Sequence, residues 1–136
     1  MEPTTARQTL LAQHERLRGH LADCSDLAHR IRDGEPVQAA LDAALDGLRR
    51  DFAEHNQAET SVLRPLLAAS SEWGKLLIDR MLEEHLAEHA VFWDMLDGTA
   101  AAIAAHIDDL VDELDAHMAA EERTFLSPQV LRNAPA

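Results

Sequence analysis

The chain has 136 residues, with 25 Asp plus Glu against 12 Lys plus Arg, which gives a formal net charge of -13 when histidine is neutral. This length fits one domain, and the negative charge disfavours nucleic acids and anionic membrane surfaces as partners. Eight histidines accompany a single cysteine, Cys24, so an internal disulfide and a cysteine-based zinc site are excluded. We expect one domain over 1–136, with its core at about 5–128 and a short, frayed C-terminal tail.

Helical periodicity fills most of the sequence and is interrupted at a few Pro- and Gly-containing breaks. Four helices are predicted: one after Pro3, with Thr4 or Thr5 as N-cap, running to Asp33-Gly34-Glu35-Pro36; one from Pro36 towards Pro65; one after Ala68-Ala69-Ser70-Ser71, running to Asp97-Gly98; and one from about Thr99 to Ser127-Pro128. Short connections make neighbouring helices antiparallel, so the predicted fold is all-α, an up-down-up-down antiparallel four-helix bundle. The lack of a long apolar run and of a signal-like N-terminus predicts a cytoplasmic protein without membrane association.

Each predicted helix has polar residues on the face that its apolar spacing assigns to the core. These residues are His14 in the first helix, His55 and Glu59 in the second, His85 and His89 in the third, and His117, followed by Glu121 and Glu122, in the fourth. In the second helix the same spacing continues to Val62 and Leu66, which we therefore expect to be buried. Residues four apart on a helix point the same way, so each pair can direct two side chains at one point.

Buried imidazoles and carboxylates without partners would each cost several kcal/mol, against a total stability of only about 5–15 kcal/mol. A bound metal cluster removes that difficulty. The donor set, rich in nitrogen and with two carboxylates, suits iron, manganese, zinc or copper better than calcium or magnesium. Seven donors exceed one metal site, so the sequence predicts two ions bridged by carboxylates.

The ordered series His14, His55-x3-Glu59, His85-x3-His89 and His117-x4-Glu122 resembles the hemerythrin family, specifically its bacterial hemerythrin-like (HHE) domains, over roughly 6–130. The resemblance implies that His85, His89 and His117 bind one iron and that His14 and His55 bind the other. Glu59 and a glutamate after His117 would bridge the two irons together with an oxo or hydroxo group. The implied cofactor is therefore an Fe-O-Fe or hydroxo-bridged iron pair, in preference to zinc or manganese.

The last carboxylate ligand has two candidates. The apolar spacing favours Glu121, at i+4 from His117, whereas the family spacing favours Glu122. Two segments of the chain also share a pattern: Glu59-x3-Leu63-x-Pro65 and Glu122-x3-Leu126-x-Pro128. Aligning them places Glu122 opposite Glu59, the first predicted bridging carboxylate. We predict Glu122 as the ligand, with an extra residue or π-bulge in the turn after His117, and keep Glu121 as the alternative.

The resemblance predicts a protein that binds oxygen or nitric oxide, or that senses oxygen, nitric oxide or iron, with a redox partner still to be identified. A second hypothesis is a di-iron oxidoreductase with peroxidase-like, catalase-like or nitric-oxide-handling chemistry, and a third is a structural bundle that holds zinc or nothing. Apolar residues one turn from the ligands predict a dry pocket for the ligand. They are Leu48, Phe52, Leu82, Leu86, Phe92, Leu114 and Met118. His20, His29 and His106 fall off the buried faces and are predicted to be solvent-facing or boundary residues, while Cys24 is predicted in the core.

Overall fold

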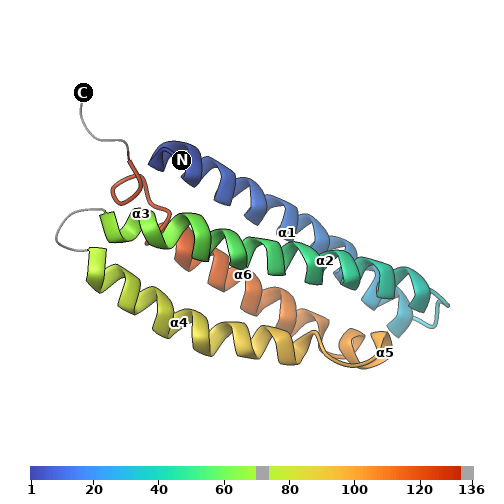
Figure 1. The fold of residues 1–136 in the computed structure, drawn as a ribbon. Helices are drawn as coiled ribbons and strands as arrows, with labels where there is room; N and C mark the ends of the chain where they lie inside the picture. Colours follow the sequence, from blue (N-terminus) through green and yellow to red (C-terminus); the bar gives the residue numbers. More distant parts are fainter. Residues whose placement is uncertain (70–73, 133–136) are drawn as a thin grey trace.

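The computed structural model describes residues 1–69 and 74–132, except the side chains of Gly74, Leu77, Leu82 and Leu86. Over this part of the chain the fold contains helices and no β-strand, which confirms the all-α prediction. The elements are α1 (Pro3–Arg32), α2 (Gln38–Ala58), the π-helix η1 (Glu59–Leu63), α3 (Arg64–Ala69), α4 (Gly74–Met95), α5 (Ala100–Ala104) and α6 (Ile107–Arg123). The long helices lie alongside one another as a bundle (Figure 1). None of the described helices is long and apolar enough to span a membrane.

The second predicted helix continues beyond Pro65, contrary to expectation. It runs on from α2 through the π-helical turn η1 into α3, and the N–H of Arg64 closes that turn on the carbonyl of Glu59, five residues back. Pro65 therefore lies in the first turn of α3, where its missing N–H costs little. The hydroxyls of Thr60 and Ser61 donate to the carbonyls of Asn56 and Gln57, four residues back, and so satisfy acceptors beside the widened turn.

The π-helical turn changes which residues of this segment are buried. An α-helix would place Val62 and Leu66 on the core face, but both are only partly buried. Leu63 and Leu67 are fully buried instead. The prediction for Val62 and Leu66 was wrong because the π-helical turn contains one extra residue and so shifts every later side chain by one position.

Helix ends differ from the predicted ones by a few residues. Helix α1 already includes Pro3 at its start, so neither Thr4 nor Thr5 is its N-cap. Helix α5 begins directly after Thr99, as predicted, and the Thr99 hydroxyl caps it by accepting from the N–H of Ala102. The fourth predicted helix is divided by a turn at 105–106 into α5 and α6. The expected capping role of Ser70 and Ser71 lies outside the described residues.

Two glycines in the breaks after α1 and α4 have positive φ angles, 92° for Gly34 and 104° for Gly98. Side chains disfavour this left-handed conformation, so glycine is suited to ending a helix there.

The apolar core consists of two clusters along the bundle axis. The larger is built mainly from α1, α2, α5 and α6 and includes Leu17, Leu45, Phe52, Phe92, Leu114 and Met118. The smaller comprises Leu10, Leu63, Leu67, Met81, Phe125, Leu126 and Leu131. Its last member, Leu131, lies after Ser127-Pro128 and is buried, so the predicted fraying there was wrong up to Leu131. This segment turns back over the bundle end near the start of α1 (Figure 1), where the Arg7 guanidinium donates to the carbonyl of Leu126 at 2.7 Å.

Cys24 is fully buried in the larger cluster, as predicted. Burial, and to a smaller extent the charge of Asp23, raises the pKa of its thiol to about 11, so it stays protonated at neutral and mildly alkaline pH. We expect the native protein to resist labelling by iodoacetamide at mildly alkaline pH and the guanidinium-unfolded protein to label fully. Rapid labelling of the native protein, followed by mass spectrometry, would contradict this burial.

Candidate metal centre

A polar layer separates the two apolar clusters, and each long helix contributes to it. On α1, His14 lies between Leu10 of the smaller cluster and Leu17 of the larger. On α4, His85 and His89 lie between Met81 and Phe92 in the same way. The helical spacing that builds the core thus also directs the histidines towards the bundle interior.

The first group of donors contains His14, His55, Glu59 and Glu121, all of them buried. The Nε2 atoms of His14 and His55 lie 3.2 Å apart. Oε1 of Glu59 is 2.7 Å from Nε2 of His55, and Oε1 of Glu121 is 3.1 Å from Nε2 of His14. Four donor atoms therefore meet at one point. They come from α1, from α2 and the adjoining η1, and from α6.

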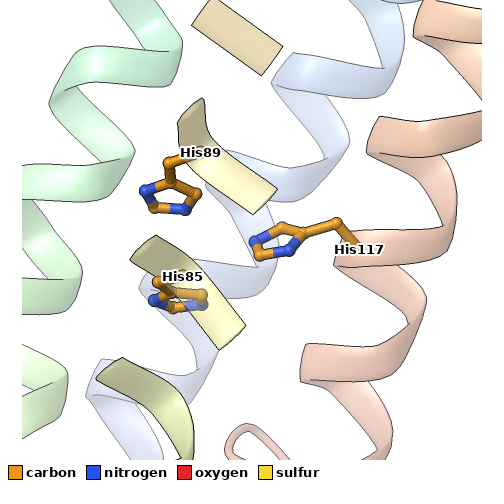
Figure 2. Close-up of side chains that lie close together, drawn as sticks. All are labelled: His85, His89 and His117. Atoms are coloured by element: carbon orange, nitrogen blue, oxygen red, sulfur yellow. The ribbon is translucent and has the colours of Figure 1, made fainter. Parts of the chain in front are cut away.

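The second group contains His85 and His89 of α4 and His117 of α6 (Figure 2). The rings of His85 and His89 stack with centroids 4.6 Å apart. The His117 ring lies 5.0 Å from the ring of His85 and 5.3 Å from that of His89. Each ring offers a nitrogen within 4.8 Å of the other two, which is close enough for three imidazoles to bind one ion.

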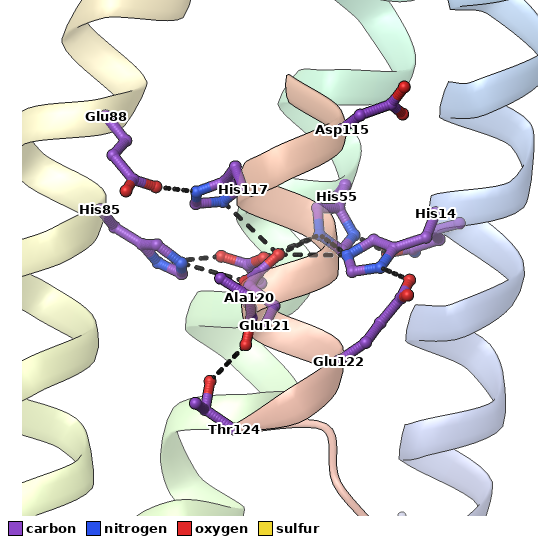
Figure 3. Close-up of polar contacts among 12 residues, drawn as sticks. His14, His55, His85, Glu88, Asp115, His117, Ala120, Glu121, Glu122 and Thr124 are labelled. Carbon is purple, nitrogen blue, oxygen red and sulfur yellow. Dashed lines mark hydrogen bonds and ion pairs between the residues drawn. The ribbon is translucent and has the colours of Figure 1, made fainter. Parts of the chain in front are cut away.

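Both buried carboxylates reach the two groups at once, and Figure 3 shows this for Glu121. Glu121 places Oε1 beside His14 and Oε2 3.0 Å from Nε2 of His85. Glu59 places Oε1 beside His55 and Oε2 3.1 Å from Nδ1 of His85. Each carboxylate thus has one oxygen towards each group, the disposition that a bridge between two cations requires.

Three of the histidines have their outer ring nitrogen bonded to a polar side chain. Nδ1 of His14 donates to Glu122 at 2.7 Å, Nδ1 of His55 donates to Gln13 at 2.7 Å, and Nδ1 of His117 donates to Glu88. Such partners hold the proton on Nδ1 and leave the Nε2 lone pair facing inwards. The neighbouring Nε2 atoms of His14 and His55 then present two lone pairs to each other, an arrangement that a cation stabilises.

The electrostatics of the carboxylates favour a cation as well. Burial, and then the charge of Glu121, raises the pKa of Glu59 well above its usual range. Burial would also raise the pKa of Glu121, but its close contacts with the surrounding imidazole nitrogens, led by that of His14, hold it well below its usual range. Two carboxylates this close cannot both ionise without a neutralising charge, and a bound cation supplies one.

Within the second group, the surroundings of His89 disfavour its charged form. Burial, reinforced by the nearby charges of His85 and His117, lowers the pKa of His89 to about 3, so this ring is neutral at physiological pH. Its Nε2 atom is buried and has no hydrogen-bond partner among the described residues, and the same holds for Nε2 of His117. Both oxygens of Glu59 lie close to imidazole nitrogens but form no hydrogen bond with them. Buried polar atoms normally have partners, so these four atoms fit metal donors.

The structure brings together six of the seven residues predicted as ligands: His14, His55, Glu59, His85, His89 and His117. The seventh, Glu122, points away from the cluster. Its carboxylate accepts from His14 Nδ1 and from the Arg18 guanidinium at 2.9 and 3.0 Å, and its side chain is 28% exposed. Glu121, kept as the alternative, occupies the interior.

The prediction of a π-bulge after His117 was wrong. Helix α6 is α-helical without interruption from Ile107 to Arg123, so i+4 from His117 falls on Glu121. A π-helical turn does occur beside the cluster, but in the other carboxylate-bearing helix, beginning at Glu59.

A cavity of about 200 Å³ borders the cluster. It is lined by Glu59, His85 and His89 and by Asn56, Thr60, Arg64 and Met81. The residues predicted to form a dry pocket are packed as core where they are described, namely Leu48, Phe52, Phe92, Leu114 and Met118, and the side chains of Leu82 and Leu86 lie outside the described part. The cavity that borders the cluster is thus lined mostly by residues of polar type, in place of the leucines and phenylalanines that were predicted.

The remaining histidines lie where the sequence predicted them. His20 is partly buried and bonds Asp51 at 2.6 Å, His29 pairs with Asp108 at 3.0 Å in the exposed region, and His106 is exposed.

Sequence reasoning missed Gln13 and Glu88, which bond imidazoles of the cluster, and Arg18, which pairs with Glu122. Gln13 and Glu88 directly precede His14 and His89, but adjacent residues on a helix point in different directions, so adjacency gave no usable signal. Glu88 in addition is one of many acidic residues on the exposed faces.

A helical bundle whose long helices all contribute to one buried layer of imidazoles and carboxylates is a metal-binding helical domain. The family model of the Hemerythrin HHE cation binding domain matches residues 5–127. The chain therefore belongs to this hemerythrin family, as the order of its histidines and glutamates predicted. No curated protein and no solved structure gives a significant match to it.

Proposed function

We propose that the chain is a non-haem di-iron protein that binds or senses a small diatomic ligand, oxygen or nitric oxide. The observation that carries this proposal is the position of Glu59 and Glu121, each with one oxygen towards each group of histidines. Two separate groups of nitrogen donors joined by two buried carboxylates suit a pair of ions better than one.

The proposed assignment gives His14 and His55 to one iron and His85, His89 and His117 to the other, with Glu59 and Glu121 between them. Imidazole and carboxylate donors together suit iron, and membership of a cation-binding family supports a resident metal. Iron in this environment would supply reversible binding of a diatomic ligand or electron transfer to it. The protein's own contribution is to fix the imidazoles through Gln13 and Glu88, and through Glu122, and to exclude bulk water.

The proposal includes an up-down-up-down order of four helical rods. Here α2, η1 and α3 count as the second rod, and α5 with α6 counts as the fourth. Contacts of α1 with α2 and α6, of α3 with α4, and of α4 with α6 support this order.

The test begins with metal analysis after expression in iron-supplemented medium, where we expect roughly two irons per chain. The reduced protein is then exposed to oxygen, and its visible spectrum is followed. A reversible oxygen-dependent band supports binding, and immediate irreversible oxidation would favour the sensor or the oxidoreductase hypothesis instead. Fewer than about one iron per chain would refute the di-iron proposal and leave the zinc-holding or structural bundle.

Site variants show whether the iron is held by the assigned residues. We expect His89→Ala and Glu59→Ala to lower both iron content and melting temperature, because part of the metal-binding free energy is folding free energy. His106→Ala, at an exposed position, serves as the matched control and should change neither. Unchanged iron in both site variants would contradict the assignment.

A further inference from the structure

The phenylalanine rings of this protein gather around the three-histidine group. The sequence has three phenylalanines, all of them fully buried, and each makes a ring contact with one histidine of that group. The centroid distances are 5.3, 5.4 and 6.2 Å for the pairs Phe52–His89, Phe92–His117 and Phe125–His85. Aromatic rings therefore line this side of the metal centre.

Trp93 extends this aromatic packing to the surface. Its ring lies on Phe52 with centroids 5.2 Å apart, and the residue is 39% exposed. Phe52 in turn meets the ring of His89 nearly edge-on, with the planes inclined by 70°. No other phenylalanine or tryptophan is exposed within 1–69 and 74–132. Three rings in successive contact, those of Trp93, Phe52 and His89, thus lead from solvent to a proposed iron ligand.

The outermost of these three rings is the one that can be oxidised. Tryptophan and tyrosine lose a single electron more readily than other aromatic side chains, and this chain has no tyrosine. Cys24 does not compete well, because its thiol is buried and protonated, whereas oxidation of cysteine proceeds from the thiolate. Phenylalanine resists oxidation, but its closely packed ring lets an electron pass between its neighbours. The arrangement therefore places an electron donor at the surface, one ring away from a metal ligand.

We propose that Trp93 donates electrons through Phe52 to the metal centre when hydrogen peroxide is the oxidant, so that oxidation falls on a surface ring and spares the ligands. Peroxide takes up two electrons and two protons and becomes two waters. The indole gives up the two electrons one at a time, releases two protons to solvent and gains a ring hydroxyl from water. One peroxide and one Trp93 thus yield one hydroxytryptophan and one water. This inference rests on the proposed di-iron function and adds to it a site of oxidative modification.

A comparison of iron-loaded and zinc-loaded protein tests the inference without any substitution. Both forms receive the same small excess of peroxide, and their tryptic peptides are analysed by mass spectrometry. Trypsin separates Trp93 from Trp73, because Lys75 and Arg80 lie between them. Zinc has no redox chemistry, so we expect about tenfold more hydroxylated Trp93 in the iron-loaded form. Equal modification of the two forms, or an unmodified Trp93 in the iron-loaded form, would overturn the inference.

Two matched variants test whether the electrons pass through Phe52. Phe52→Leu removes the ring between Trp93 and His89 but leaves the indole open to any diffusible oxidant. Phe125→Leu makes the same change at another fully buried ring beside a ligand histidine, one that lies in the other apolar cluster. With yields expressed per bound iron, we expect Trp93 oxidation to fall severalfold in Phe52→Leu alone. Equal yields in the two variants would overturn the role of Phe52, and the comparison of iron with zinc depends on neither variant.

Trp93→Phe tests whether the ligands are spared. Without the indole, peroxide should oxidise the ligand histidines instead, so we expect iron to be lost faster for each peroxide added. Val91→Ala is the control, because it changes another exposed side chain of α4 and removes no oxidisable group. Iron loss at the wild-type rate in Trp93→Phe would refute the protection. Metal analysis separates the two proposals: absence of iron overturns both, whereas bound iron with an unmodified Trp93 overturns this one alone.

Discussion

Glu121→Gln is expected to remove most of the metal from the protein, while Glu122→Gln leaves the metal in place and only weakens its binding. Glu121 contacts imidazoles of both groups with its two oxygens, so its amide replacement loses a charge at the centre of the cluster. Glu122 instead holds the Nδ1 proton of His14 and pairs with Arg18. Losing such an orienting partner typically lowers metal affinity about 10- to 100-fold, and losing the bridge should have a larger effect.

The two variants are matched, since they make the same chemical change at neighbouring positions of α6. The measurement is iron per chain after gel filtration, followed by the rate of iron loss to a chelator. Circular dichroism of both proteins checks that the helices persist. If Glu122→Gln lost its iron and Glu121→Gln kept it, Glu122 would be the ligand, in agreement with the family spacing.

Leu63→Ala is expected to destabilise the protein by about 2–5 kcal/mol, because Leu63 is fully buried in the smaller apolar cluster and its truncation leaves a cavity. The same change at Leu66 should cost less than half as much, since Leu66 is only partly buried against that cluster. The contrast follows from the π-helical turn, which places Leu63 rather than Val62 on the core face.

Urea unfolding of the two variants, followed by circular dichroism, measures this difference. Both should be compared in metal-free form, so that changes in metal affinity do not enter the free energy of unfolding. An equal loss for Leu63→Ala and Leu66→Ala, or a larger one for Leu66→Ala, would show that this segment is a regular α-helix in solution.

The sequence predicted the helical class and the histidine cluster because both depend on one periodicity. His14 takes the place of an apolar residue in the regular spacing of its helix, so its side chain lies on the same buried face as the apolar ones. This holds whatever the exact ends of the helix are. The same periodicity indicated Glu121 on α6, and the structure places that side chain in the interior. The alignment of Glu122 with Glu59 pointed elsewhere because it compared a segment that continues through a π-helical turn with one in which the helix ends at Arg123 and turns follow.

The π-helical turn, the helix continuing past Pro65 and the packing after α6 could not be predicted from the sequence, for physical reasons. Thr60 and Ser61 satisfy carbonyls beside the π-helical turn, yet hydroxyl residues do the same in many ordinary helices, so their presence is not a signature. Pro65 suggested a helix end because its missing N–H is costly inside a helix, and the preceding turn removes that cost. The packing of Phe125 depends on tertiary contacts that no local pattern encodes.

The contact between His14 and Glu121 joins residues that are 107 positions apart in the sequence. Such distant pairings form late, because a long stretch of chain must be ordered before they are made. On the ribosome, α1 and α2 can pair while the rest of the chain is still being synthesised, but the donor set stays incomplete until α6 has emerged. Metal loading therefore belongs to the end of folding, and a chain truncated before Glu121 would retain several imidazoles without the carboxylate that joins them.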